Sequence, residues 1–339
     1  MPISTDSHLE QPVLIAGFGS IGRRHFRNLR AMGYKNFVFH RTHRGTVPDD
    51  ELADWPSFGD IDAALKLRPA IAVIANPTAR HIEVAAAAAY AGCDLFIEKP
   101  VSASMDGCDE LLNCIRGRNL IAAVGCQFRF HPLLIRLRDE IRSGRCGAVI
   151  GARAEWGEYL PDWHPWEDHR QSYSARPELG GGALLTLIHP LDYLYWLFGP
   201  VSRVQAVARS VPSLQTTTDD DWAEVSLNFE SSVVAQVHVD FWQRPPVHRL
   251  AVWGETGRAV LDFNAGALEW ESEGQDAAAA QEQLPSGFER NTMFIDEMRS
   301  FVASVLSRRR PAVPLEDGIA VLKIALEAKQ SARGDRVHA

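Results

Sequence analysis

A glycine-rich turn near the start of the chain constrains the fold more than any other feature. Gly17, Gly19 and Gly22 have the spacing GxGxxG, directly after the apolar run at 12–17 and before a helical pattern at 20–32. A strand, a tight glycine turn and a helix in this order begin a βαβ unit. The first glycine permits the turn, the second lets a phosphate approach the backbone, and the third lets helix and strand pack closely. The turn predicts a dinucleotide site; the alternative is an ordinary connection between strand and helix.

Apolar runs recur through the first 130 residues and alternate with helical patterns. Strands that are apolar at every position are covered on both faces, which is typical of a parallel sheet flanked by helices. We therefore expect a parallel α/β arrangement with strands at 12–17, 36–40, 70–76, 93–100 and 120–128, and helices at 20–32, 79–92 and 104–117.

The pattern changes after about residue 145, where apolar and polar residues alternate. Such alternation is typical of antiparallel strands with one covered face and one face left for solvent or a partner. We expect these strands at 147–159, 201–209, 221–230, 232–242, 248–263 with a turn at 254–257, and 267–271. Helices are expected at 131–143, 291–308 and 316–332.

Composition excludes several classes of protein. A net charge of −8 over 339 residues argues against a general nucleic-acid binder. The five cysteines are an odd number without a CxxC motif, which favours reduced thiols and a cytoplasmic location. The longest apolar run, 182–199, is interrupted by His189, Pro190 and Asp192, and the first eleven residues lack the apolar stretch of a signal peptide. We therefore expect neither a nucleic-acid partner nor a membrane span.

The end of the second expected strand bears on the choice of cofactor. NAD sites usually place a carboxylate there, for the ribose 2′-hydroxyl, whereas this chain has His40, Arg41 and Arg44. Arginine pairs well with a 2′-phosphate, so the sequence favours NADP(H), with NAD(H) as the other possibility. A solvated basic turn is the alternative interpretation. Further candidate phosphate ligands open the first helix: Ser20, Ile21 and Arg23.

Several motifs together resemble the Gfo/Idh/MocA family of oxidoreductases. They are the glycine turn, NPTARH at 76–81, EKP at 98–100, the glycine-rich segment 180–192 and the segment 316–328. The resemblance implies an α/β Rossmann domain at 1–128, followed by an α+β domain at 129–339 with an open, mainly antiparallel sheet that serves substrate binding and oligomerisation. It also implies NAD(P)-dependent oxidation or reduction of a sugar, cyclitol or sugar nucleotide, in a homodimer or homotetramer.

Two residues correspond to the catalytic residues of that family. Lys99, at the end of a parallel strand, is expected to hydrogen-bond the reacting oxygen or relay its proton. His189 is expected to exchange a proton with the substrate hydroxyl, since imidazole titrates near neutral pH. Asp192, three residues later, either orients this ring or belongs to a buried polar pair.

The remaining candidate site residues come from the family motifs and from an aromatic stretch. Those expected at the cofactor, besides Lys99, are Asn76, Pro77, His81, Glu98 and Gln127. Those expected at the substrate, besides Lys99 and His189, are Arg129, Asp192 and, because a ring and a hydroxyl suit a sugar, Trp163 and Tyr173. The last set includes part of an aromatic stretch at 158–178, for which a subunit interface is an equal alternative. A zinc site from His164, Asp168 and His169 fits no strong metal signature, and no metal is expected.

One position departs from the family pattern. Many members have an aspartate four residues before the histidine, whereas this chain has Leu185. The departure leaves two alternatives to a sugar dehydrogenase. One is a non-catalytic NADP(H)-binding sensor or assembly subunit, and the other is a reductase of imines or conjugated double bonds.

Overall fold

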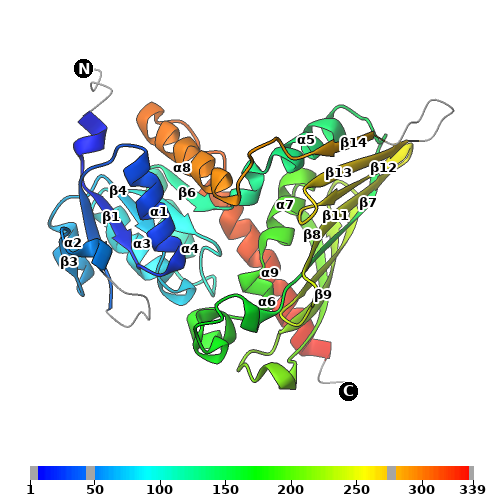
Figure 1. Cartoon of the computed structure of the whole chain (residues 1–339), viewed down its shortest axis with the longest axis horizontal. Coiled ribbons are helices and arrows are strands. Elements are labelled where there is room, and N and C mark those ends of the chain that lie inside the picture. The colour runs from blue at the N-terminus through cyan, green and yellow to red at the C-terminus, as the bar shows by residue number, and fades with distance from the viewer. Residues whose placement is uncertain (1–6, 43–49, 273–279, 336–339) are drawn as a thin grey trace. The chain divides into compact units, whose positions relative to one another are not determined.

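The computed structural model describes residues 7–42, 50–272 and 280–335, and the chain divides into two compact units (Figure 1). The first unit comprises Met1–Cys126 and Asn291–Ile319, and the second comprises Gln127–Arg290 and Ala320–Ala339. The first change of unit lies close to the expected border at 128. The return of 291–319 to the first unit was not expected from the sequence, which placed all of 129–339 in one domain.

The first unit is built on a six-stranded sheet of order β3-β2-β1-β4-β5-β6, in which every neighbouring pair is parallel. Its strands are β1 (Val13–Ala16), β2 (Phe37–His40), β3 (Ser57–Phe58), β4 (Ile71–Ile74), β5 (Asp94–Glu98) and β6 (Ala122–Gly125). Ala16 lies opposite His40 and Ile74, so the residues that follow β1, β2 and β4 emerge at one edge. The strand order reverses between β1 and β4, and ligands of such sheets bind beyond the carboxyl ends of the strands at this point.

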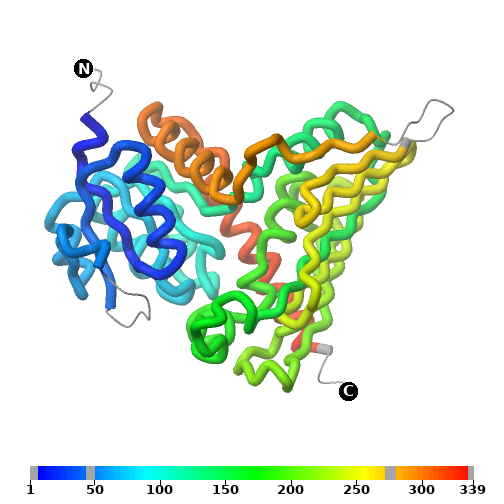
Figure 2. Tube along the Cα trace, in the orientation of Figure 1, coloured from blue at the N-terminus to red at the C-terminus, as the bar shows by residue number. Residues whose placement is uncertain are grey.

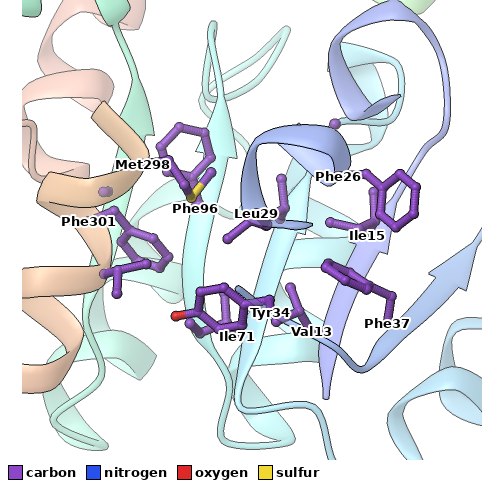
Figure 3. Close-up of a cluster of buried hydrophobic side chains, with 14 of the residues drawn as sticks. Val13, Ile15, Phe26, Leu29, Tyr34, Phe37, Ile71, Phe96, Met298 and Phe301 are labelled. Carbon is purple, nitrogen blue, oxygen red and sulfur yellow. The ribbon is translucent and has the colours of Figure 1, made fainter. Parts of the chain in front are cut away.

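Aromatic and aliphatic side chains form the core on one face of this sheet (Figure 3). Phe26 and Leu29 of α1 (Ser20–Ala31) and Met298 and Phe301 of α8 (Arg290–Ser307) cover strand residues such as Phe96. Burial of each such side chain stabilises the fold by about 1.5–3 kcal/mol. This burial explains why α8 joins the first unit, and Figure 2 shows the orange helix beside the cyan strands.

The other helices of this unit are short. They are α2 (Ile61–Leu65), α3 (His81–Tyr90) and α4 (Cys108–Gly117). α3 contacts β4 and β5, and α4 packs against α3. The small alanine side chains of α3 allow this close approach, and Ala85, Ala88 and Ala89 are fully buried.

The second unit is built on an eight-stranded sheet of order β14-β13-β12-β11-β7-β10-β9-β8. Its strands are β7 (Val149–Gly157), β8 (Val201–Arg209), β9 (Trp222–Phe229), β10 (Val234–Asp240), β11 (Val247–Gly254), β12 (Gly257–Asp262), β13 (Ala267–Ser272) and β14 (Ala280–Gln283). Neighbouring strands are antiparallel except β7 and β10. The predicted mainly antiparallel sheet is therefore confirmed. The parallel pair of β7 and β10 is possible because a long connection with helices α6 (Ala183–Thr186) and α7 (His189–Phe198) separates β7 from the strands that follow it.

Helices cover one face of this second sheet. α5 (Pro132–Arg142) contacts β12 and β13, α6 (Ala183–Thr186) contacts β9 and β10, and α7 (His189–Phe198) contacts β7 and β10. α9 (Leu315–Asp335) reaches β8, where the Ser331 hydroxyl accepts a hydrogen bond from the Ala206 N–H. Along each strand, residues buried against the helices alternate with residues on the opposite face of the sheet. The residues on that opposite face are partly exposed, as the alternating sequence pattern predicts. None of the helices in the described ranges combines the length and the apolar character that a bilayer crossing requires.

The expected elements have close counterparts in the structure, and the elements that were not expected include three short ones. They are β3, α2 and β14, which have two, five and four residues. Segments this short carry too few residues for a periodic pattern, and β14, which lies at the edge of its sheet, pairs only with β13.

Candidate active site

The glycine turn leaves open space at its middle glycine. Gly17 has φ +91°, and a side chain there would lie 2.5 Å from the carbonyl oxygen of Ala75 and the nitrogen of Asn76. A side chain on Gly22 would collide with the carbonyl of Gly17, whereas none of the described atoms lies within 4 Å of the corresponding position on Gly19. The outer glycines thus serve the packing of the protein itself, and the middle one leaves room for a ligand.

The first helix begins at this open position. Gly19 precedes α1 and, having no side chain, cannot cap the N–H groups that begin with Ser20 and Ile21. Free N–H groups and the positive end of the helix dipole favour an anion at this point. The residues present therefore fit the pyrophosphate of a dinucleotide.

Arg23 is engaged within the protein. Its guanidinium lies 4.3 Å from the Phe18 ring centroid and donates a hydrogen bond of 2.7 Å to Glu51, which Arg27 also binds. The hydrogen bond from Arg27 lowers the pKa of Glu51 to about 2, with Arg23 acting in the same direction and burial against them. Glu51 was not anticipated, because it lies far along the chain from α1 and in no recognised motif.

The end of β2 carries the basic residues expected at the ribose. His40 is buried, and burial together with the charge of Arg80 lowers its pKa. Arg41 is half-buried, and its Nε donates to the Ser57 hydroxyl at 2.9 Å. Arg44 lies outside the described residues.

The loop after β4 contains the expected NPTARH motif. Asn76 is half-buried and Pro77 is exposed, whereas His81 is buried at the start of α3. The two ring nitrogens of His81 lie 2.7 Å from the Asn76 carbonyl and 2.9 Å from the Pro100 carbonyl. His81 therefore contacts both the loop at Asn76 and the loop at Pro100, and both of its ring nitrogens are used in these contacts.

Burial lowers the pKa of His81, while its contacts with the two carbonyls and the charge of Glu98 act in the opposite direction. Carbonyl oxygens only accept hydrogen bonds, so a neutral ring donates to one of the two carbonyls and a protonated ring donates to both.

Lys99 follows β5, and Glu98 beside it points inward. One Glu98 oxygen lies 2.6 Å from Nε2 of His25, and the other accepts the Lys99 N–H at 3.1 Å. Gly125 of the adjacent strand makes room, since a side chain there would lie 3.1 Å from this carboxylate. Both oxygens of Glu98 are thus used inside the protein, while the Lys99 side chain is half-buried and precedes a cis peptide bond to Pro100.

In the second unit, Arg129 and Asp192 bind each other. The Arg129 guanidinium donates from Nε at 3.1 Å and from Nη2 at 2.7 Å, and both side chains are buried. Arg129 belongs to a short 3-10 helix, Gln127–Phe130, in which Gln127 is also buried. The pair joins this segment to α7, so Asp192 belongs to a buried polar pair.

Aromatic rings hold His189. It begins α7, with Pro190 in the first turn, and is 1% exposed. Its ring stacks on Trp156 at 5.4 Å and meets the edge of Phe128 at 4.9 Å. Trp156 stacks in turn on His248 at 4.3 Å, which extends the ladder of rings.

The position of the missing carboxylate is apolar and closed. Leu185 lies in α6 and is 3% exposed, with Thr186 buried beside it. The position therefore offers His189 no acid.

The aromatic stretch forms four 3-10 helices, Leu160–Asp162, His169–Gln171, Tyr173–Ala175 and Pro177–Leu179. Trp163 packs edge-on against Phe241, whereas Trp166 is 74% exposed and Tyr173 38% exposed. His169 contacts the Leu214 carbonyl and Asp168 pairs with Arg170. Within the described ranges, no group of three histidine, cysteine or acidic side chains has the arrangement of a metal site.

Two family models match the chain. The oxidoreductase family, NAD-binding Rossmann fold, matches residues 12–126, and the GFO/IDH/MocA C-terminal domain matches residues 134–260. An uncharacterized oxidoreductase of Synechocystis is 30% identical over 202 residues, which are 56% of this chain and 53% of that protein. This chain thus spans about half the length of that relative.

Characterised proteins are similar at lower identity. The UDP-N-acetylglucosamine 3-dehydrogenase of Acidithiobacillus ferrooxidans is 26% identical over 252 residues, which are 74% of this chain and 73% of that protein. The structure of a levoglucosan dehydrogenase in complex with NADH and levoglucosan matches with a TM-score of 0.84, covering 96% of this chain and 98% of that one. At 19% identity, this second likeness shows the fold alone.

Proposed function

This chain belongs to the Gfo/Idh/MocA family of NAD-binding oxidoreductases, and from this premise we propose that it transfers a hydride between NADP(H) and a sugar, cyclitol or sugar nucleotide. The observation that carries the proposal is the glycine turn, which leaves open space at Gly19 and at the uncapped start of α1. The similarity to the UDP-N-acetylglucosamine 3-dehydrogenase supports the substrate class.

The proposed cofactor site uses residues of the first unit. The backbone of the glycine turn at Gly19 and the start of α1 would hold the pyrophosphate, and Arg41, at the end of β2, would pair with the 2′-phosphate of NADP(H). The absence of an acidic side chain at 40–42 supports NADP(H) over NAD(H). When bound, the nicotinamide donates or accepts the hydride.

The proposed acid–base chemistry follows the family resemblance. His189 exchanges the hydroxyl proton of the substrate at a ring nitrogen, and the Lys99 ammonium donates a hydrogen bond to the same oxygen. Stacking on Trp156 limits the rotation of the His189 ring, and the Arg129–Asp192 pair fixes its helix. With Leu185 in place of a carboxylate, His189 works without that acid.

Substrate recognition is proposed for the aromatic stretch and oligomerisation for the second sheet. Trp163 and Tyr173 offer rings and a hydroxyl to a sugar. On the sheet face opposite the helices, Val207, Val234 and Trp253 have exposed fractions of 48%, 44% and 39%. Exposed apolar side chains of this kind support a subunit contact in a homodimer or homotetramer. The cytoplasmic location stays a prediction.

The test combines binding with turnover. The protein is titrated with NADPH and NADH by fluorescence, then assayed with a panel of sugars, cyclitols and sugar nucleotides that includes levoglucosan and UDP-N-acetylglucosamine. Lys99→Met should bind cofactor normally and lose at least about a thousandfold in kcat. Lys323→Met, an exposed lysine on α9, is the matched control. A near-normal kcat for Lys99→Met excludes the role of Lys99.

The closed apolar position at Leu185 motivates the alternatives. A reductase of imines or conjugated double bonds would keep its activity in His189→Asn, whereas a sugar dehydrogenase would lose it. A non-catalytic cofactor-binding subunit would bind NADPH and oxidise it with no member of the panel.

A further inference from the structure

Side chains fix the backbone on both sides of Lys99. On its N-terminal side, the Lys99 N–H donates to Glu98 at 3.1 Å. On its C-terminal side, the Pro100 carbonyl lies 2.9 Å from Nδ1 of His81. The residue that carries the proposed catalytic amine is therefore held at its own N–H and, one residue further on, at the Pro100 carbonyl, by side chains that are themselves buried.

A buried histidine holds Glu98. Nε2 of His25 lies 2.6 Å from the Glu98 carboxylate, and the two side chains are 0% and 8% exposed. The His25 ring meets Phe96 edge-on at 5.0 Å and Phe294 at 6.2 Å, so it has little freedom to turn. This contact joins α1, which begins at the glycine turn, directly to β5, the strand that Lys99 follows.

A second buried histidine holds Pro100. The other nitrogen of His81 lies 2.7 Å from the Asn76 carbonyl, and the nitrogen of Asn76 borders Gly17 so closely that a side chain on Gly17 would collide with it. A chain of contacts therefore runs from the glycine turn through Asn76 and His81 to Pro100. The two histidines thus approach Lys99 from opposite sides, one through Glu98 and one through Pro100.

We propose that His25 and His81 are positioning residues, which hold the backbone of Lys99 in register with the glycine turn and so keep its ammonium in one place. The proposal rests on the proposed function, in which Lys99 is catalytic. Nε2 of His25 and both ring nitrogens of His81 contact groups of the protein itself, so we assign neither histidine a contact with the substrate or cofactor. A displacement of about 1 Å at a reacting group can lower a rate about a hundredfold, so loss of either contact should affect kcat.

The kinetic test uses paired variants of His25. In His25→Gln the side-chain amide still reaches Glu98, whereas in His25→Asn it is too short. We expect His25→Asn and His81→Leu to lower kcat at least tenfold while the Kd values for NADPH and NADH change less than threefold. His25→Gln should keep kcat within threefold of the wild type.

Leu29→Ala provides the control for stability. Leu29 is fully buried on α1, one turn after His25, and packs in the core away from Glu98. We expect Leu29→Ala to lower Tm without lowering kcat. If it lowers kcat as much as His25→Asn does, the two histidines are only structural and the proposal is overturned.

A spectroscopic measurement makes the test independent of turnover. The chain has only five lysines, Lys35, Lys66, Lys99, Lys323 and Lys329, so the Cε signal of Lys99 in a ¹³C-lysine-labelled protein is assigned by its loss in Lys99→Met. This signal should move or broaden in His25→Asn and His81→Leu, and should stay in place in His25→Gln and Leu29→Ala.

The outcomes separate the two proposals. If Lys99→Met is inactive while His25→Asn and His81→Leu retain normal kcat, the positioning role is wrong and the proposed function stands. If Lys99→Met retains turnover, the proposed function fails at Lys99, and the lysine spectrum alone decides whether the histidines position it. An unchanged Lys99 signal in His25→Asn and His81→Leu overturns the positioning role.

Discussion

Arg41 is the residue on which the proposed preference for NADP(H) depends. Its Nε donates a hydrogen bond to the Ser57 hydroxyl, and this bond fixes the direction of the side chain at the end of β2. A charge-assisted hydrogen bond to a phosphate contributes about 1.5–3 kcal/mol. One such hydrogen bond to the 2′-phosphate would therefore make the Kd for NADPH about one to two orders of magnitude lower than the Kd for NADH.

Replacing Arg41 tests this preference. We expect Arg41→Ala to weaken NADPH binding at least about tenfold and to leave NADH binding unchanged, because only NADPH carries the 2′-phosphate. Fluorescence titration of both cofactors measures the two Kd values, and Arg30→Ala, an exposed arginine at the end of α1, is the control. Equal losses for both cofactors, or tighter binding of NADH by the wild type, would contradict the assignment.

The buried pair of Arg129 and Asp192 supports the helix of His189. Removing one partner leaves an uncompensated charge in the interior, which costs about 3–5 kcal/mol. We therefore expect Arg129→Met to lower the free energy of unfolding by this amount, measured by urea denaturation. Arg129→Met/Asp192→Leu should recover much of the loss; a double variant as unstable as the single one would show that the charge is not the cause.

At the scale of single elements, buried histidines link stability to pH. His131 precedes α5 and accepts the Leu134 N–H, and burial lowers its pKa to about 4. Burial likewise lowers the pKa of His248 well below its usual value. In the unfolded chain these histidines bind protons near pH 6.5, whereas in the folded protein they stay neutral to lower pH. The free energy of unfolding therefore falls as the pH drops below about 6.5.

The variant His131→Asn isolates one of these contributions, because asparagine also caps helices. Between pH 6.5 and pH 4, the wild type should lose up to about 3 kcal/mol more free energy of unfolding than this variant. Urea denaturation at a series of pH values measures the difference, and His8→Asn in the first unit serves as the control. Identical slopes for wild type and His131→Asn would refute the assignment.

At the scale of the whole molecule, the second sheet carries the surface for which we propose subunit assembly. Trp253 of β11, Gly151 of β7 and Val234 of β10 are neighbours in register, so Trp253 and Val234 flank a glycine on the face opposite the helices. Glycine has no side chain to cover its neighbours, and both apolar side chains are exposed by about two fifths.

We expect Val234→Lys to shift a homodimer or homotetramer toward the monomer, because a buried unpaired ammonium is costly. Sedimentation velocity measures the distribution of species. Lys66→Met, on the first unit, should leave it unchanged. An oligomer that withstands Val234→Lys would place the subunit contact on another surface.

The sequence by itself determined the features that depend on neighbouring residues. The apolar runs gave the strands of the first sheet, alternation gave those of the second, and the glycine spacing located the open turn. These signals are readable because the side-chain directions of strands and helices repeat over two to four residues.

Only the tertiary structure decided which partners the polar side chains take. Glu98, which is expected at the cofactor, binds His25, which is 73 positions away, and Arg129, which is expected at the substrate, binds Asp192, which is 63 positions away. The packing of α8 in the core of the first unit likewise depends on residues that lie far from it in the sequence. A buried charge or apolar face must find a complement somewhere in the folded chain, and the local pattern around it does not contain that complement.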